Sequence, residues 1–86
     1  MIPVHKLLLK FLKDRHVHKE EIEIAVQKHP QEPYEYYNFT DIIVDKDNPD
    51  TFTFIDEKDN FLKIPYENVR KVLRNEKPVW DKNIEM

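Results

Sequence analysis

The sequence FTFIDEKDNFLKIPYENVRKVLRNEKPVW occupies residues 52–80 and indicates the fold class. Its short apolar runs are separated by turn-forming clusters at residues 59–60 and 75–77. Residues 51–56 place phenylalanines on one face and threonine and isoleucine on the other, as a β-strand does, and residues 61–65 return along them after a turn. This region therefore predicts antiparallel β-structure.

The segment after this hairpin fits two structures. Residues 66–73 carry apolar residues at helical spacing, whereas residues 69–82 also fit a second β-hairpin. Periodicity does not separate the two structures in so short a run. We expect one brief helical turn at residues 66–69, followed by two strands.

The chain begins with the pattern of an amphipathic helix. Apolar residues recur at i, i+3, i+4, i+7 and i+8 from Val4, which places them on one stripe. Pro3 suits the first helical turn, where its missing N–H group is no loss. We expect a helix within residues 1–15, with the stripe against the core. Leu9 lies off the stripe, where it would be free to contact a partner.

The middle of the chain adds strands and aromatic residues. Ile22, Ile24 and Val26 alternate with polar residues and predict a half-buried strand. A further strand is expected within residues 41–45. Between these strands, an aromatic cluster follows a proline-bounded loop and suits either base stacking or coverage of the core. Its members are Tyr34, Tyr36, Tyr37 and Phe39.

We therefore expect one α+β domain over residues 1–86. Its N-terminal helix, within residues 1–15, packs on a curled antiparallel sheet of about five strands, for which a barrel-like arrangement is one option. Residues 20–82 are mainly β-structure, and residues 83–86 form a frayed tail. A chain of 86 residues can bury one modest core.

The chain contains no glycine, serine or cysteine. Glycine-rich phosphate loops, dinucleotide-binding turns and serine or cysteine nucleophiles are therefore excluded. His16 and His18 stand two residues apart and could share a metal ion, with His5 or His29 as a third ligand, but no carboxylate spacing or second such histidine pair supports this site. Metal-independent acid–base chemistry by His29 with Glu67 or a nearby aspartate is the enzyme alternative. We expect no catalytic residues, no metal and no cofactor.

Charge is distributed unevenly over a chain whose net charge is −3. Residues 20–60 hold twelve acids and three bases, whereas residues 1–19 hold five bases and one acid. Residues 61–86 hold six bases and four acids. Two basic ends that fold together would attract a polyanion weakly, and a solvated surface is the simpler interpretation.

The sequence also indicates where the protein resides. No segment approaches the roughly 20 apolar residues of a membrane span. The first residues lack the order of charge, apolar run and cleavage site that marks a signal peptide. We expect a cytoplasmic protein without a membrane partner. Its abundant lysine and glutamate are typical of a thermophile.

One family resemblance spans residues 3–82. It rests on three pieces in order: Ile64-Pro65-Tyr66, then Val69 and Val72, then Val79-Trp80-Asp81-Lys82. Together these pieces resemble the RNA cyclic-group end recognition domain family, whose members are small and mostly archaeal. The resemblance implies a domain that binds RNA and senses processed RNA ends.

The chain departs from the family pattern at two points. Lys28-His29 stands where the family carries Arg-Gly, and Glu67-Asn68 stands where it carries His-Arg. A histidine–arginine pair would hold a phosphate by charge and bidentate donation, so its replacement removes donors and adds a negative charge. The resemblance therefore transfers the fold more directly than the function.

The leading hypothesis is a non-catalytic RNA-binding module that recognises single-stranded or processed RNA ends. The alternative is a protein-interaction or structural module of the same fold, which binds a protein partner or a second copy at a sheet edge. A contiguous basic groove that holds Lys28, Arg70 and Arg74 on one face would favour RNA, whereas scattering of these residues, with an apolar patch elsewhere, would favour protein partners. Trp80 is assigned to the core, and Tyr66 to base stacking. The predicted RNA-binding residues are Lys28, His29, Lys63, Tyr66, Arg70, Lys71 and Arg74.

Overall fold

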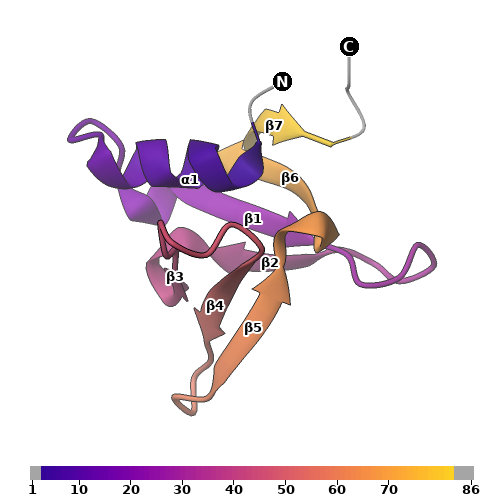
Figure 1. The fold of residues 1–86 in the computed structure, drawn as a ribbon. Coiled ribbons are helices and arrows are strands. Elements are labelled where there is room, and N and C mark those ends of the chain that lie inside the picture. The colour runs from indigo at the N-terminus through magenta and orange to yellow at the C-terminus, as the bar shows by residue number, and fades with distance from the viewer. Residues whose placement is uncertain (1–2, 83–86) are drawn as a thin grey trace.

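The computed structural model describes residues 3–82. The predicted frayed tail at 83–86 and the first two residues of the predicted helical segment lie outside the described residues. Within residues 3–82 the chain forms one α-helix, three short 3-10 helices (η) and seven strands (Figure 1). In chain order they are α1 (Val4–Lys13), η1 (Lys19–Glu21), β1 (Ile22–Val26), β2 (Glu35–Asn38), η2 (Phe39–Asp41), β3 (Ile42–Ile43), β4 (Thr51–Ile55), β5 (Phe61–Pro65), η3 (Tyr66–Asn68), β6 (Val69–Arg74) and β7 (Lys77–Asp81).

Helix α1 confirms the amphipathic pattern. It begins after Pro3, and its last turn carries Lys10 and Lys13, where cations interact favourably with the helix dipole. One face of the helix is buried against the core. No helix within the described range 3–82 has both the length and the apolar character that crossing a membrane requires.

The strands form two antiparallel sheets. The order is β2-β1-β6-β7 in the four-stranded sheet and β3-β4-β5 in the three-stranded sheet. The α+β class and the antiparallel pairing are therefore confirmed. The expected single sheet of about five strands and its barrel-like arrangement are wrong, because the two sheets of the described chain do not close into a barrel.

Two of the 3-10 helices explain why the strands divide between sheets. The helix η3 separates β5 from β6, so the chain leaves the three-stranded sheet at Pro65 and enters the four-stranded sheet at Val69. The helix η2 connects β2 to β3 in the same way. Such short connectors redirect the chain. The predicted helical turn followed by two strands is confirmed, but those strands belong to a different sheet from β4 and β5.

The four-stranded sheet has a core face and an outer face, because neighbouring residues in a strand point to opposite sides. Ile24 and Val72 belong to the buried core cluster, whereas Ala25 does not, although it is buried. We call the side of Ala25 the outer face. The core-face row across the sheet is Tyr37, Ile24, Val72 and Trp80, and the adjoining outer-face row is Tyr36, Ala25, Lys71 and Asp81.

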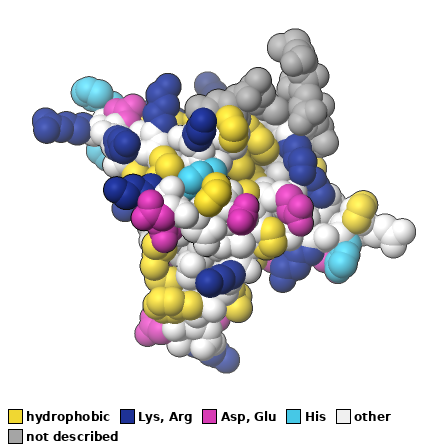
Figure 2. Space-filling model, viewed as in Figure 1, with side chains coloured by type: hydrophobic (Ala, Val, Ile, Leu, Met, Phe, Trp, Pro, Cys, Tyr) yellow, Lys and Arg dark blue, Asp and Glu magenta, His cyan; other side chains and the backbone are white. Residues whose placement is uncertain are grey.

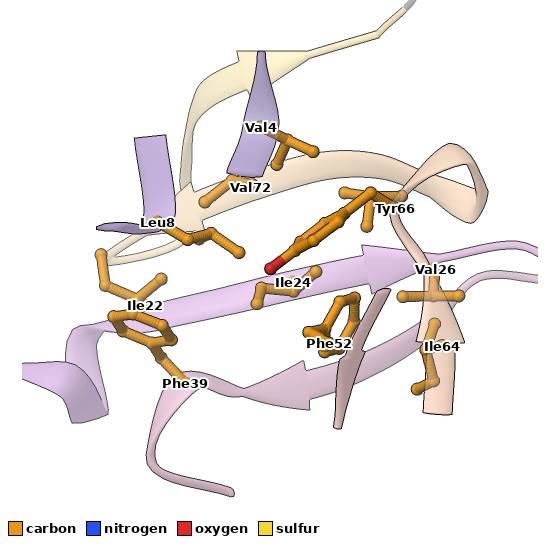
Figure 3. Packing of buried hydrophobic residues seen from close by; sticks show 11 residues of the cluster. Val4, Leu8, Ile22, Ile24, Val26, Phe39, Phe52, Ile64, Tyr66 and Val72 are labelled. Carbon is orange, nitrogen blue, oxygen red and sulfur yellow. The ribbon is translucent and has the colours of Figure 1, made fainter. Parts of the chain in front are cut away.

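One apolar core joins α1 to both sheets (Figure 3). Leu8 of α1 is fully buried, and Phe39 of η2 and Phe52 of β4 are each 1% exposed. Burying side chains of this size contributes roughly 1.5–3 kcal/mol each. Trp80 of β7 packs against the same cluster. The helix and the two sheets are therefore held together by shared apolar contacts.

Candidate nucleic-acid interface

Basic residues meet at one end of the four-stranded sheet. Strand β1 ends there at Val26, which pairs with Val69 at the start of β6. Lys28 and His29 follow β1 and are exposed. Because β7 runs antiparallel to β6, its last residues reach the same end. We call this group the basic end, and its members are Lys28, His29, Arg70, Lys71 and Lys82.

Backbone contacts hold the basic end together. The amide of Gln27 donates to the carbonyl of Asn68 at 2.9 Å, and the amide of Lys82 donates to the carbonyl of Arg70 at 2.9 Å. The ammonium group of Lys82 also donates to the carbonyl of Glu67 at 2.8 Å. The end of β1 and the end of β7 are therefore both fixed to the start of β6.

The loop after β1 is ordered by the side chain of Gln27. Its amide group donates to the carbonyl of Pro30 at 3.3 Å and to that of Glu32 at 2.7 Å. The backbone amide of Glu32 donates to the carbonyl of His29 at 3.0 Å. Lys28 and His29 therefore stand on a backbone whose course is set by hydrogen bonds.

Two tyrosines lie beside the basic end on the outer face. Tyr36 is 55% exposed and shares a cross-strand row with Ala25 and Lys71. The ammonium nitrogen of Lys71 lies 5.8 Å from the centre of the Tyr34 ring, which is a cation–π distance. The short side chain of Ala25 leaves room for this contact across β1. Bases can stack on aromatic rings, and the cations beside the rings can attract the neighbouring phosphates.

The aromatic cluster at residues 34–39 has members in both environments: Tyr36 is exposed, whereas other members pack in the core. Phe39 is buried, and the ring of Tyr37 stacks on that of Phe54 with centroids 4.3 Å apart. Burial, followed by the hydrogen bond and charge of Glu35, raises the pKa of Tyr37 to about 12. Alternation along a strand is the signal that separates Tyr36 from Tyr37, but the sequence pattern of this segment does not predict a strand.

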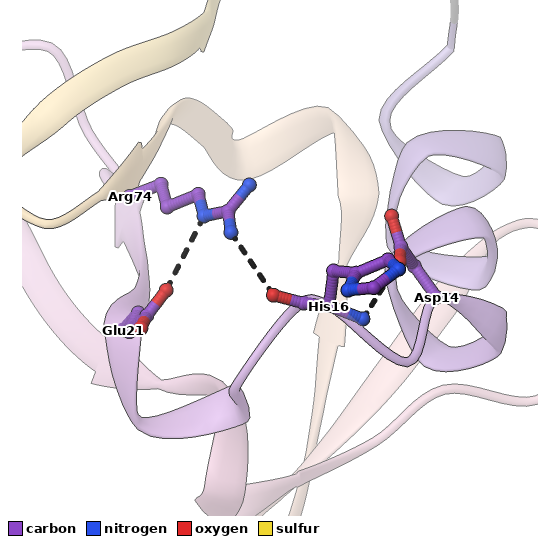
Figure 4. Close-up of polar contacts among 4 residues, drawn as sticks. All are labelled: Asp14, His16, Glu21 and Arg74. Carbon is purple, nitrogen blue, oxygen red and sulfur yellow. Dashed lines mark hydrogen bonds and ion pairs between the residues drawn. The ribbon is translucent and has the colours of Figure 1, made fainter.

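Arg74 lies on β6 but away from the basic end. It pairs across the sheet with Ile22 and Lys77, at the far end of the strand. Its Nε lies 3.3 Å from the carboxylate of Glu21, and its Nη2 donates to the carbonyl of His16 at 3.2 Å (Figure 4). These contacts join β6 to the segment that follows α1.

Two other predicted residues also lie apart from the basic end. Lys63 is exposed on β5 of the three-stranded sheet. Tyr66 is 7% exposed, and its ring lies 5.2 Å from that of His5 and 5.3 Å from that of Phe52, centroid to centroid. A ring enclosed in this way has no open face on which a base could stack, so Tyr66 is part of the core.

Acidic groups accompany the basic ones. The ammonium group of Lys71 lies 4.0 Å from the carboxylate of Asp81. Figure 2 shows Lys and Arg side chains interspersed with Asp and Glu over the visible face, without a broad surface of one sign. Attraction for a polyanion is therefore local, and we expect it to be modest.

The histidines do not gather into a metal or acid–base site in the described chain. Residues 3–82 contain no group of three or more metal-ligating side chains close enough to hold an ion. Nε2 of His5 lies 3.0 Å from the carbonyl oxygen of Asp45, so this nitrogen carries a proton and donates. His29 is exposed, and no hydrogen bond joins it to Glu67 within the same range. The geometry offers cations, amide donors and aromatic rings for binding.

Comparisons with known proteins add no relative. No protein-family model matches the chain, and no curated protein or solved structure matches it. The resemblance of residues 64–66, 69, 72 and 79–82 to the RNA cyclic-group end recognition domain family therefore stays a prediction.

Proposed function

We propose that this chain is a non-catalytic RNA-binding module that holds a single-stranded RNA end on the outer face of the four-stranded sheet. The observation that carries the proposal is the exposed ring of Tyr36, which shares a row with Lys71, while Lys71 lies against the ring of Tyr34. Stacking of a base on such a ring contributes roughly 1–3 kcal/mol and tolerates any base.

The basic end would supply the phosphate contacts. Lys28 and His29 are exposed, and Arg70 and Lys71 are half-buried at the start of β6. Because Glu67 stands where the similar family carries histidine, we assign a terminal phosphate to Lys28 and Arg70. Lys28 and Arg70 belong to the same end of the sheet as the row that holds Tyr36 and Lys71, so a terminal phosphate held by them would lie near a base stacked on Tyr36.

Fluorescence anisotropy of short labelled RNAs tests the proposal. Single strands that end in a 3′-hydroxyl, a 3′-phosphate or a 2′,3′-cyclic phosphate are titrated at low and at moderate salt. We expect saturable binding that depends on the end group and weakens as salt rises, because phosphate contacts release counterions. Absence of saturable binding at low salt would contradict the proposal.

Matched variants locate the site. Tyr36→Ala is expected to weaken binding by about 5- to 150-fold, the loss of one stacked base. Arg70→Ala is expected to weaken binding and to reduce its salt dependence. Arg74→Ala and Lys63→Ala are the controls, since Arg74 contacts Glu21 and Lys63 lies in the other sheet. Equal weakening by all four variants would show unspecific attraction and refute the assigned site.

A protein-interaction module is the second candidate, and a separate surface favours it. Phe61 is 66% exposed, and Leu62 and Ile43 are each 48% exposed, all on the three-stranded sheet. Figure 2 shows hydrophobic side chains gathered over this lobe. A groove of about 450 Å³ lies between α1 and the β3 region, and Leu9 and Leu12 of α1 line it. Exposed apolar side chains on a sheet that does not contain the basic end favour a protein contact.

A single substitution separates the two candidates. Phe61→Glu places a charge in the apolar surface of the three-stranded sheet, far along the chain from Tyr36. It should weaken a contact with a different protein made through that surface and leave RNA affinity unchanged. Pull-down with the native chain and the variant, beside the RNA titration, measures both effects.

A further inference from the structure

The open edge of β5 is a binding surface in its own right. Within residues 3–82, β5 pairs with β4 alone and forms one edge of the three-stranded sheet. The β4–β5 hairpin extends away from α1 (Figure 1). Its turn is ordered by the carboxylate of Asp56, which accepts from the amides of Lys58 and Asn60 at 2.8 and 2.9 Å. The edge therefore presents unpaired backbone groups on an ordered hairpin.

Hydrogen bonds at the two ends of the hairpin show which backbone groups face outward. The amide of Asp56 donates to the carbonyl of Asn60 at 3.0 Å, and the amide of Tyr66 donates to the carbonyl of Asp50 at 2.9 Å. In an antiparallel pair, residues that bond to the partner strand recur at every second position. On β5 these are the even-numbered residues, so the amides and carbonyls of the odd-numbered residues face the open edge.

We infer that β5 pairs with β5 of a second copy of this chain, antiparallel, about a twofold axis through Leu62. In this register Phe61 lies opposite Lys63 of the second copy, so every outward amide of these two residues meets a carbonyl. The two three-stranded sheets become one continuous sheet. This inference rests on the second candidate function, with the partner identified as a second copy, and it is independent of the RNA proposal.

Side chains on both faces fit this register. Leu62 lies in a cross-strand row with Phe54 and Ile42, so two apolar rows join end to end at the axis. On the opposite face, Phe61 covers the alkyl stem of Lys63 of the second copy, whose charge still reaches solvent. The pairing therefore buries the two most exposed apolar side chains of the strand.

Neighbouring registers are less favourable. An axis through Lys63 would set two lysines directly opposite each other, which is destabilising, and would pair Phe61 with Pro65, which has no amide. An axis through Phe61 would pair Lys63 with Asp59, which lies in the turn with φ 62°. The register centred on Leu62 avoids both problems.

Other edges of the described sheets are less suited to pairing. Strand β7 contains Pro78 and an irregular register beside it, and β3 has two residues. Proline, bulges, short strands and edge lysines are the usual means by which edges avoid pairing. Strand β5 also carries Lys63 and Pro65, but the register centred on Leu62 packs the stem of Lys63 against Phe61 and leaves Pro65 outside the paired residues. Strand β2 has four residues, whereas β5 pairs with β4 without a register shift over five.

Light scattering coupled to size exclusion measures the association. The native chain is expected to show twice its chain mass of 10.5 kDa. Lys63→Pro removes an outward amide and none that bonds to β4, so it should give a monomer. Lys63→Thr keeps the amide and should remain dimeric. A native chain that is monomeric at every concentration, or a dimer that Lys63→Pro leaves intact, overturns the inference.

A cysteine cross-link tests the register even if Lys63→Pro does not fold. The chain has no cysteine, so Leu62→Cys introduces one thiol at the axis. Facing Cα atoms in such a pair are about 4.5–5.5 Å apart, within disulfide range, and mild oxidation should give a covalent dimer. Phe61→Cys is the matched control, because its counterpart would lie about 8 Å away, beyond that range. Equal cross-linking at both positions, or at neither, overturns the inference.

The experiments distinguish the absence of a β5–β5 dimer from the absence of any protein-interaction function. A monomeric native chain still leaves a contact with a different protein open to the Phe61→Glu pull-down. Loss of captured protein in that variant would support the candidate, whereas unchanged capture would remove it.

Discussion

Tyr66 places a hydroxyl group inside the apolar core without a hydrogen-bond partner among residues 3–82. Figure 3 shows the oxygen pointing into the cluster between α1 and β1. A buried hydroxyl without a partner costs roughly 1–3 kcal/mol. Tyr66→Phe is therefore expected to raise the free energy of unfolding by about 1 kcal/mol near neutral pH, as measured by urea denaturation. A decrease would show that the hydroxyl is hydrogen-bonded in solution.

The same residue limits stability in alkali. Burial, followed by the charge of Asp45, raises the pKa of Tyr66 to about 12 from its ordinary value of 10.0. The unfolded chain therefore loses the phenolic proton first. Stability is full below the unfolded pKa and falls as pH rises toward the folded pKa, by about 1.4 kcal/mol per pH unit for one tyrosine.

Tyr66→Phe should reduce this alkaline slope without removing it, because Tyr37 also has a pKa raised to about 12. Urea midpoints of the native chain and the variant, measured on either side of pH ~10, give the slopes. Tyr37→Phe is the matched comparison. Identical slopes in the native chain and Tyr66→Phe would show that the folded chain does not protect this phenol.

Residue types are easier to predict than residue environments. Charge alone selects Arg74 as an RNA contact, but its guanidinium is bound to Glu21, 53 residues away, and no spacing in the sequence indicates that pairing. The direction of the Tyr66 ring depends on η3, which turns it between α1 and Phe52. By contrast, Lys28 and His29 are exposed because they follow the end of a strand that the sequence does predict.

The β6–β7 turn is the element in which the absence of glycine matters most. Asn75 and Glu76 have φ of 52° and 68°, the left-handed pair that a two-residue turn of this kind requires. Asparagine tolerates this conformation, whereas glutamate carries a Cβ penalty of roughly 1 kcal/mol. Glu76→Gly is therefore expected to raise the free energy of unfolding by about 0.5–1 kcal/mol in urea denaturation.

The Glu76→Gly variant also removes a negative charge, and this effect must be separated from the change in the backbone. Glu76 lines a small acidic pocket with Glu20, Glu21 and Glu23. Glu76→Gln removes the charge and keeps the strained backbone. Glu76→Gln should raise the free energy of unfolding less than Glu76→Gly does, and this increase should become smaller as salt rises. An equal increase in the two variants would show that repulsion between glutamates, and not backbone strain at residue 76, destabilises the native turn.

Elements with clear periodicity are predictable, and elements defined by long-range pairing are not. Helix α1, strand β1 and the β4–β5 hairpin follow from alternation and helical spacing. Strand β2 (Glu35–Asn38) does not, because its two tyrosines stand between a glutamate and an asparagine without apolar alternation, and strand propensity depends on neighbours. The strand expected at residues 41–45 is reduced to Ile42–Ile43 because η2 occupies its start.

The whole molecule depends on which strands share a sheet. Strand β1 pairs with β6, from the other half of the chain, and this choice leaves β4 and β5 in the second sheet. Periodicity contains no information on that choice. Its consequence for the site is direct, because Lys63 and Arg70 are near in sequence but lie in different sheets. The sequence therefore provides candidate residues, and the sheet order decides which of them meet.

The proposed RNA site and the proposed dimer edge lie in different sheets. We therefore expect RNA binding and dimerisation to be independent of each other. Lys63→Pro should halve the mass in light scattering without changing the affinity for an RNA short enough to occupy one site, because Tyr36 and Lys71 lie in the four-stranded sheet. Tyr36→Ala should do the reverse, weakening RNA binding while the mass is unchanged. Both quantities are measured on the same samples. If Lys63→Pro lowers mass and affinity together while Lys63→Thr lowers neither, the RNA site spans two copies, and the placement of the site on one chain is wrong.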